Sequence, residues 1–293
     1  MKTRKNALLL FSKVPEPGKV KTRLTPLKDG IFDPEDASYL YHCMLFDVVE
    51  ICCDALADLE RDSLEAAKRE GAQGGASVSD EYTIIISSPG EQQERMMRAL
   101  FKESGTWPRD IVFIHDDGES FDAHYNDAFS QVWELGFDTV LSMGCDMPAL
   151  RRSIVVEGFE RLHTLCEIPG GGIVLAPDQE LGVSVVGWTR ETAFDHTGVF
   201  YNQDGLTVLP GYIRKCKAKG LPALYLPDVP DVDSMADLDH NVMLVEALMY
   251  CARFQEDVTA PWRTAEALHE IGYTDVRIMP NNLRDDRNEI DRP

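Results

Sequence analysis

The chain has 293 residues, with 29 Lys and Arg against 50 Asp and Glu, and its formal charge at neutral pH is -21. An acidic surface of this kind repels phosphate backbones, so we expect no nucleic-acid partner. No apolar run approaches the roughly 18 residues of a membrane span, and the N-terminus lacks a signal-peptide cleavage pattern. We therefore expect a soluble, cytoplasmic protein. The seven cysteines show no metal or redox spacing, which predicts reduced thiols.

The length exceeds that of a typical domain of roughly 100 to 200 residues. We predict one large domain over residues 1–254, followed by a short helix-strand extension over residues 255–293. The extension is expected to hold a helix near Thr264 to Ile271 and a strand near Asp275 to Ile278. The sequence leaves the oligomeric state open.

Apolar strands alternate with helices along the large domain. The run from Ala7 to Phe11 predicts a buried strand, and a helix begins after Asp33 and runs to about Leu59, before a helix end and loop over residues 60–80. Further strands are predicted at 83–86, 111–114, 139–143, 173–176, 183–186 and 223–226, with helices at 92–101, 122–135, 153–165 and 235–249. This order predicts an α/β fold with a mainly parallel sheet that is covered on both faces.

The loop after the first strand concentrates positive charge in an acidic chain. Its four cations are Lys13, Lys19, Lys21 and Arg23, and Gly18 lets backbone amides approach a ligand closely. We expect these groups to neutralise a diphosphate or a triphosphate. The loop is not a P-loop, because it has a single glycine. The alternative is a solvated surface loop.

An aspartate follows the strand predicted at 139–143. Ligands of open α/β sheets lie beyond the carboxyl ends of the strands, which is where Gly144 and Asp146 fall. A carboxylate at this position suits Mg²⁺ or Mn²⁺, which bind through one or two carboxylates together with substrate phosphates. The alternative is that Asp146 caps a helix before Pro148.

Two more aspartates follow the last strand of the large domain. Alternation along an extended chain points Asp231 and Asp233 to the same side, where they are candidate partners of Asp146 in a metal site. We prefer Asp233 over Asp231 as the ligand. Ser234 and Asp237 instead fit a capping box for the next helix.

A polar turn after the strand predicted at 173–176 is the third candidate. Asp178 is expected to hold an acceptor hydroxyl or to act as a base, and Gly182 admits a ligand near the backbone. The alternative is an ordinary connection between two strands. The remaining candidates, His115, His124 and His196, are expected to be surface or capping residues, because no paired ligand spacing is present.

Three segments together carry a resemblance to a known family. Residues 11–24, 144–150 and 231–238 resemble the glycosyltransferase-A-like nucleotide-diphospho-sugar transferase superfamily, in matching order over roughly residues 6–245. Within it, the likeness is greatest to the bacterial group often called selenodomain-associated transferases. A more distant likeness is to 2-phospholactate guanylyltransferases.

The resemblance implies a three-layer α/β/α fold in which the first loop, including Ser12 and Thr22, binds nucleotide phosphates. It also implies that Asp146 and Asp233 bind the metal, and that the partners are a nucleotide sugar or an NTP and a small-molecule acceptor. Residues 177–183 match the acceptor motif of neither group, so the acceptor stays open.

Three functional hypotheses follow. The leading one is a metal-dependent glycosyltransferase that uses a nucleotide sugar. The second is a nucleotidyltransferase that joins an NTP to a phosphorylated acceptor and releases pyrophosphate. The third is a non-catalytic module that binds nucleotides.

Overall fold

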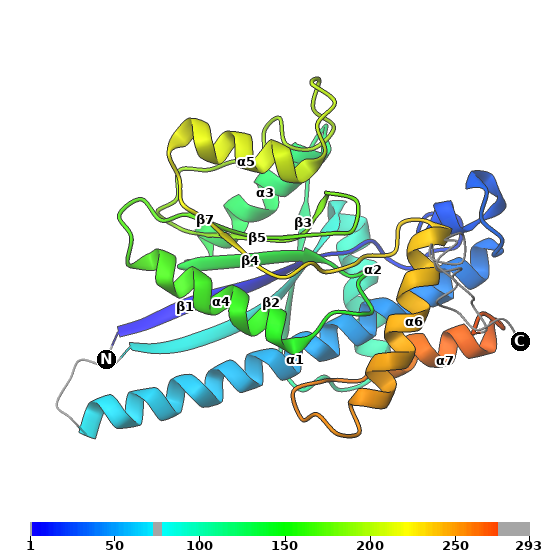
Figure 1. The fold of residues 1–293 in the computed structure, drawn as a ribbon, viewed down its shortest axis with the longest axis horizontal. Coiled ribbons are helices and arrows are strands. Elements are labelled where there is room, and N and C mark those ends of the chain that lie inside the picture. The colour runs from blue at the N-terminus through cyan, green and yellow to red at the C-terminus, as the bar shows by residue number, and fades with distance from the viewer. Residues whose placement is uncertain (1, 73–77, 275–293) are drawn as a thin grey trace, which may run out of the picture.

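The computed structural model describes residues 2–72 and 78–274, and a seven-stranded sheet lies at its centre (Figure 1). The strands are β1 (Lys2–Phe11), β2 (Val78–Pro89), β3 (Ile111–Asp116), β4 (Thr139–Gly144), β5 (Ile173–Pro177), β6 (Val183–Thr189) and β7 (Ala223–Tyr225). Their order in the sheet is β3-β2-β1-β4-β6-β5-β7. Only β6 runs antiparallel to its neighbours in this sheet. The predicted mainly parallel sheet is therefore confirmed.

Helices cover both faces of the sheet. They are α1 (Pro34–Ala72), α2 (Gly90–Glu103), α3 (Phe121–Glu134), α4 (Arg152–Cys166) and α5 (Val208–Lys219). Side chains of a strand alternate between the faces, so Leu8 and Leu10 pack in the core under α1, α2 and α4. Ala7 and Leu9 pack in the opposite core, under α3 and α5. The predicted three-layer α/β/α fold is confirmed.

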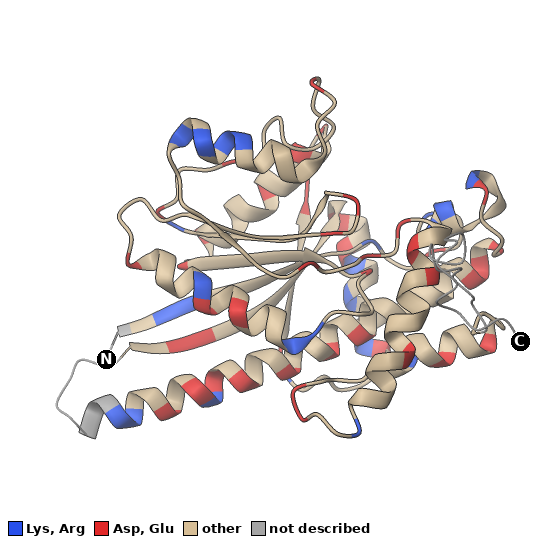
Figure 2. Ribbon diagram, in the orientation of Figure 1, with Lys and Arg blue, Asp and Glu red and all other residues tan. Residues whose placement is uncertain are grey.

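The first helix is longer than the sequence pattern predicts. It does not end near residue 60 but continues to Ala72. Its last turns are rich in good helix formers and include an ion pair between Glu65 and Arg69 one turn apart, at 3.2 Å. Acidic and basic residues are interspersed along this stretch (Figure 2). A solvated stretch has no apolar periodicity, and that is why the pattern fails there.

One helix was not predicted. α5 has Pro210 and Gly211 in its first turn, a pair that is typical of loops and hides the helical pattern of the residues that follow. Pro210 is tolerated because the first amides of a helix have no partner within the helix.

The seven cysteines are free thiols, as predicted.

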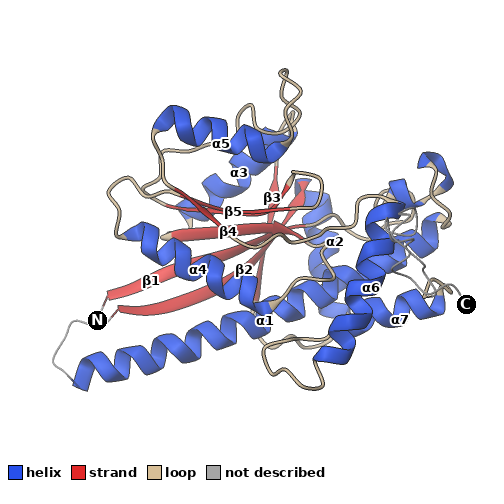
Figure 3. Ribbon diagram, in the orientation of Figure 1, coloured by secondary structure: helices blue, strands red, loops and turns tan. Residues whose placement is uncertain are grey.

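Two helices follow the sheet, α6 (Met235–Cys251) and α7 (Trp262–Glu270), and they lie beside the N-terminal half of α1 (Figure 3). The predicted capping box of α6 is present: Ser234 and Asp237 each bond to the other's backbone amide. The helix predicted in the extension corresponds to α7, and the predicted strand lies outside the described residues. None of the helices within the described ranges has the length and hydrophobicity needed to cross a bilayer.

A buried carboxylate on α1 holds the start of α7. Asp47 accepts hydrogen bonds from the backbone amides of Arg263 (3.2 Å) and Thr264 (2.7 Å), which are first-turn donors without a partner in their own helix. The guanidinium of Arg263 lies 3.2 Å from the same carboxylate. Asp47 therefore does for α7 what a capping residue does for most helices.

We expect Asp47→Ala to release α7. The substitution leaves two first-turn amides, one of them buried, without an acceptor. The cost is about 2 kcal/mol, so the α7 amides should exchange with solvent roughly 30-fold faster. Hydrogen exchange followed by mass spectrometry measures this. Asp62→Ala, on the exposed side of α1, is the matched control and should leave exchange unchanged. Equal exchange in both variants would contradict the capping role.

Candidate functional site

The sheet has a switch point between β1 and β4. The chain runs from β1 outward through β2 and β3, then returns to place β4 on the other side of β1. Phe11 pairs with Gly144 at the carboxyl ends of these two strands. Ligands of open α/β sheets bind at such a point.

A pocket of about 780 Å³ opens there. Its lining includes ten of the predicted site residues: Ser12, Lys13, Lys19, Lys21, Thr22, Arg23, Asp146, Asp178, Asp231 and Asp233. Gly18 does not line the pocket, although it lies in the same loop with a φ of 74°. The hydroxyl of Ser12 is already engaged, because Ser12 is buried and bonds to Tyr41 at 2.9 Å.

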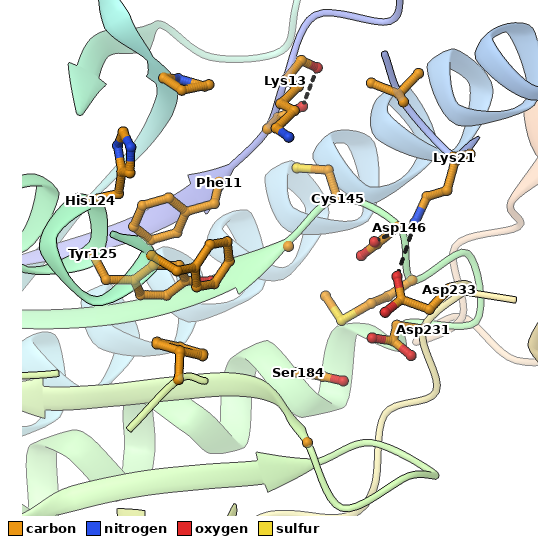
Figure 4. A pocket seen from close by; sticks show the side chains of 18 of the residues that line it. Phe11, Lys13, Lys21, His124, Tyr125, Cys145, Asp146, Ser184, Asp231 and Asp233 are labelled. Atoms are coloured by element: carbon orange, nitrogen blue, oxygen red, sulfur yellow. Dashed lines mark hydrogen bonds and ion pairs between the residues drawn. The ribbon is translucent and has the colours of Figure 1, made fainter. Parts of the chain in front are cut away.

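Lys21 is the central cation of the site (Figure 4). Its ammonium donates to Asp146 at 2.6 Å and to the carbonyl of Val232 at 2.5 Å, and its side chain is only 7% exposed. Burial alone would lower the pKa of Lys21, but the carboxylates of Asp146 and Asp233 outweigh it and raise the pKa. Lys21 therefore stays charged and joins the first loop to two later segments.

The other cations of the loop are more exposed. Arg23 lies 2.8 Å from Asp233, and both side chains are at least half exposed, so this pair adds little stability. Lys19 pairs with Glu16 of its own loop at 3.1 Å. Within the described residues, Lys13 forms no ion pair. Lys13 is thus the cation most available to a ligand.

Asp231 lies in an excess of negative charge. Burial, followed by the nearby carboxylates of Asp146 and Asp233, raises the pKa of Asp231 to about 7. Its carboxylate accepts a hydrogen bond from Gln179 at 3.1 Å, and the same amide donates to Asp237 at 2.7 Å. Gln179, which was not predicted from the sequence as a site residue, therefore ties the turn after β5 to the start of α6.

The side chain of Asp178 stabilises the turn in which it lies. One carboxylate oxygen accepts from the amides of Glu180 and Gly182, each at 2.7 Å. A Cβ on Gly182 would lie 1.9 Å from the other oxygen of Asp178, so only glycine fits beside it. The turn therefore holds a carboxylate rigidly at the wall of the pocket.

The far end of the pocket is aromatic, a feature that was not predicted from the sequence. Phe11 stacks on Tyr125 with ring centroids 3.9 Å apart. Three more rings line this end, from Phe121, Phe200 and Tyr201. In Figure 4, Phe11 and Tyr125 lie at the opposite side of the pocket from Lys21.

The expected histidine roles are only partly met. His115 is a surface residue that contacts Glu94 at 3.0 Å. His124 lines the pocket, and its Nδ1 lies 2.6 Å from the buried carboxylate of Asp116. His196 is fully buried among aromatic rings, where burial lowers its pKa to about 3. The surface or capping role expected for His196 was therefore wrong, since the chain packs it as a neutral core ring.

The chemistry of the donor set fits a divalent cation. Asp146, Asp231 and Asp233 offer the oxygen ligands that Mg²⁺ and Mn²⁺ prefer. Burial first, and then the neighbouring carboxylates, raise the pKa of Asp231 despite the nearby ammonium of Lys21. Within the described ranges, no group of three or more Asp, Glu, His or Cys side chains is already positioned to hold a metal ion. The ammonium of Lys21 lies 2.6 Å from Asp146 and 3.8 Å from Asp233, so it occupies the position between these two carboxylates.

The arrangement of strands and helices is an α/β fold of the nucleotide-diphospho-sugar transferase type. A protein from Desulfovibrio desulfuricans G20, described as a candidate nucleotide-diphospho-sugar transferase, aligns with a TM-score of 0.65 at 22% identity, over 92% of this chain and 96% of that chain. The resemblance predicted from the sequence is thereby confirmed for the fold. A model of the family "uncharacterized protein conserved in bacteria (DUF2064)" matches residues 76–203.

Two further solved structures are more distant. A cytidylyltransferase from Leptospira borgpetersenii serovar Hardjo-bovis (strain JB197) aligns at 10% identity with a TM-score of 0.41, over 96% of this chain and 99% of that chain. Rv0371c from Mycobacterium tuberculosis H37Rv, in complex with manganese, aligns at 15% identity with a TM-score of 0.34, over 82% and 98%. These scores are too low to bear on function. No curated protein matches the chain.

We expect Lys21→Met to bind Mn²⁺ more tightly than the wild type in the absence of nucleotide. The substitution removes the competing ammonium and keeps an unbranched side chain that is one atom shorter, and the gain in affinity should be at least about tenfold. Electron paramagnetic resonance of free Mn²⁺ measures it. Lys13→Met is the control, since Lys13 contacts none of these carboxylates, and should change affinity less than about threefold. Equal or weaker binding by Lys21→Met would rule out the competition.

Proposed function

We propose that the protein is a metal-dependent transferase that uses a nucleotide-activated donor, with a nucleotide sugar as the leading candidate. The observation that carries this proposal is the convergence of the basic loop with the three aspartates in one pocket at the switch point. A pocket with both charges suits a ligand that brings phosphates together with a cation. The fold, common to this chain and the Desulfovibrio desulfuricans protein, supports the proposal.

The basic loop would bind the phosphates. Lys13 has no competing ion pair among the described residues, and Lys19 holds only an exposed one, so both are free to contact phosphate oxygens. Lys21 would exchange its contact with Asp146 for one with the phosphates as a ligand enters. These cations would then stabilise the negative charge that develops on the leaving nucleoside diphosphate.

The cation would be held by Asp146 and Asp233, with Asp231 as a further ligand. When bound, it would offset the charge of the diphosphate and help it to leave. Arg23 is close enough to Asp233 to orient this carboxylate, at 2.8 Å.

Asp178 would position the acceptor. One of its oxygens holds the turn, and within the described residues no hydrogen bond engages the other. This oxygen would accept the proton of an acceptor hydroxyl. In the transfer, the hydroxyl oxygen bonds to the sugar C1, and the bond between C1 and the diphosphate breaks with its electron pair leaving on the diphosphate.

A donor panel tests the proposal. The protein is incubated with Mg²⁺ and each common nucleotide sugar or NTP, and melting temperature and products are followed. We expect stabilisation by the donor and slow release of nucleoside diphosphate from one nucleotide sugar. Asp146→Asn should reduce turnover roughly 100-fold, whereas Asp228→Asn, at an exposed position outside the pocket, should not.

Other outcomes separate the alternatives. Pyrophosphate release from an NTP in the presence of a phosphorylated acceptor would replace glycosyl transfer by nucleotidyl transfer. Stabilisation by nucleotides without turnover on any donor would leave a binding module. A protein whose melting temperature responds to neither nucleotide nor metal would refute all three.

A further inference from the structure

The aromatic end of the pocket exposes rings that a folded chain normally covers. Phe121 is 46% exposed and Tyr201 is 87% exposed, and both line the pocket. Their centroids lie 6.0 Å apart in an edge-to-face arrangement. A flat ring placed against them would remove apolar surface from water.

The segment that carries Tyr201 is held in place rather than loosely attached. The carboxylate of Asp122 on α3 accepts from the amides of Gly198 (2.7 Å) and Phe200 (2.9 Å). Tyr201 itself adopts a left-handed backbone with a φ of 44°, which costs a residue with a side chain about 1 kcal/mol or more. The ring is thus presented to the pocket by a defined backbone.

His124 adds a directed hydrogen-bonding group. Asp116 is buried and accepts from Ser87 at 2.6 Å through one oxygen, while its other oxygen lies 2.6 Å from Nδ1 of His124. An ionised carboxylate can only accept, so Nδ1 carries the proton. In the tautomer with its one proton on Nδ1, Nε2 is an acceptor, and the described residues provide no donor to it.

Charge is divided along the pocket. The Lys and Arg side chains of its lining all come from the loop between β1 and α1, and the aromatic end contributes none. A ligand that fills both ends therefore has an anionic part and a neutral flat part. A nucleotide has this form.

We propose that Phe121, Tyr201 and His124 form the subsite for the nucleobase of the donor, and that His124 selects bases with a ring N–H at their hydrogen-bonding edge. Uracil, thymine, guanine and hypoxanthine have such a donor, whereas cytosine and adenine have a ring acceptor there. The two rings are perpendicular, so a base stacks on the face of one and meets the edge of the other, which contributes affinity for any base. The preference among bases comes from Nε2 of His124. The inference rests on the proposed function, since it assumes a nucleotide donor.

Calorimetric titration tests the subsite, with UDP, GDP, CDP, ADP and inorganic pyrophosphate as probes in the presence of Mg²⁺. The wild type should bind UDP or GDP at least about fivefold more tightly than CDP and ADP. His124→Ala should abolish this preference. Tyr201→Ala and Phe121→Ala should weaken every nucleoside diphosphate about tenfold and leave pyrophosphate unchanged.

Tyr250→Ala is the matched control, because Tyr250 is 61% exposed on α6 and lies outside the pocket lining. Tyr201 is so exposed that its removal cannot disturb the core. If nucleotides bind but Tyr201→Ala and Phe121→Ala bind them as the wild type does, the aromatic subsite is refuted and the proposed function stands. A preference that survives in His124→Ala refutes the selection. If the wild type binds neither pyrophosphate nor any nucleotide, the proposed function fails and the subsite with it.

Discussion

The site depends on one buried charge pair. The ammonium of Lys21 has almost no access to water, so Asp146 and the carbonyl of Val232 must replace its hydration. Removing one partner from such a pair typically costs about 3 to 5 kcal/mol, because the other charge is left uncompensated. Three segments far apart in the sequence are thereby fixed together: the basic loop, the end of β4 and the approach to α6.

The same pair limits what the ligand-free site can bind. A chain with a formal charge of -21 repels anions, and the cations nearest to the carboxylates are already neutralised by them. Phosphates that bind without a cation would have to separate Lys21 from Asp146 and leave the Asp146 carboxylate without a positive partner. A divalent cation alone would have to expel the ammonium. Phosphates and cation together satisfy both partners, which is a physical reason to expect them to bind as one unit.

The sequence predicted what depends on local pattern. The basic loop after β1 and the aspartate after β4 were both predicted to follow strands, because strand ends and charged residues can be recognised from the sequence. The pattern could not show that Lys21 turns inward to Asp146, since this contact spans 125 positions. The contact between His124 and Asp116 was not predicted for a related reason. They lie on successive elements, and their contact depends on how α3 packs against β3.

The two ends of the pocket bind a ligand through different kinds of interaction. At the basic loop, the binding free energy comes from attraction between opposite charges. Salt screens this attraction, and the carboxylates that already pair with the cations compete with a ligand for them. At the aromatic end the binding free energy comes from burial and from one directed hydrogen bond, which salt leaves almost untouched. The affinity for the phosphates and the preference for one base can therefore be set by different residues. The charged end cannot distinguish nucleoside diphosphates that differ only in their base, because these carry the same phosphates. Discrimination among such bases must come from other groups of the lining, and Phe121, His124 and Tyr201 supply rings and a hydrogen-bonding atom for it.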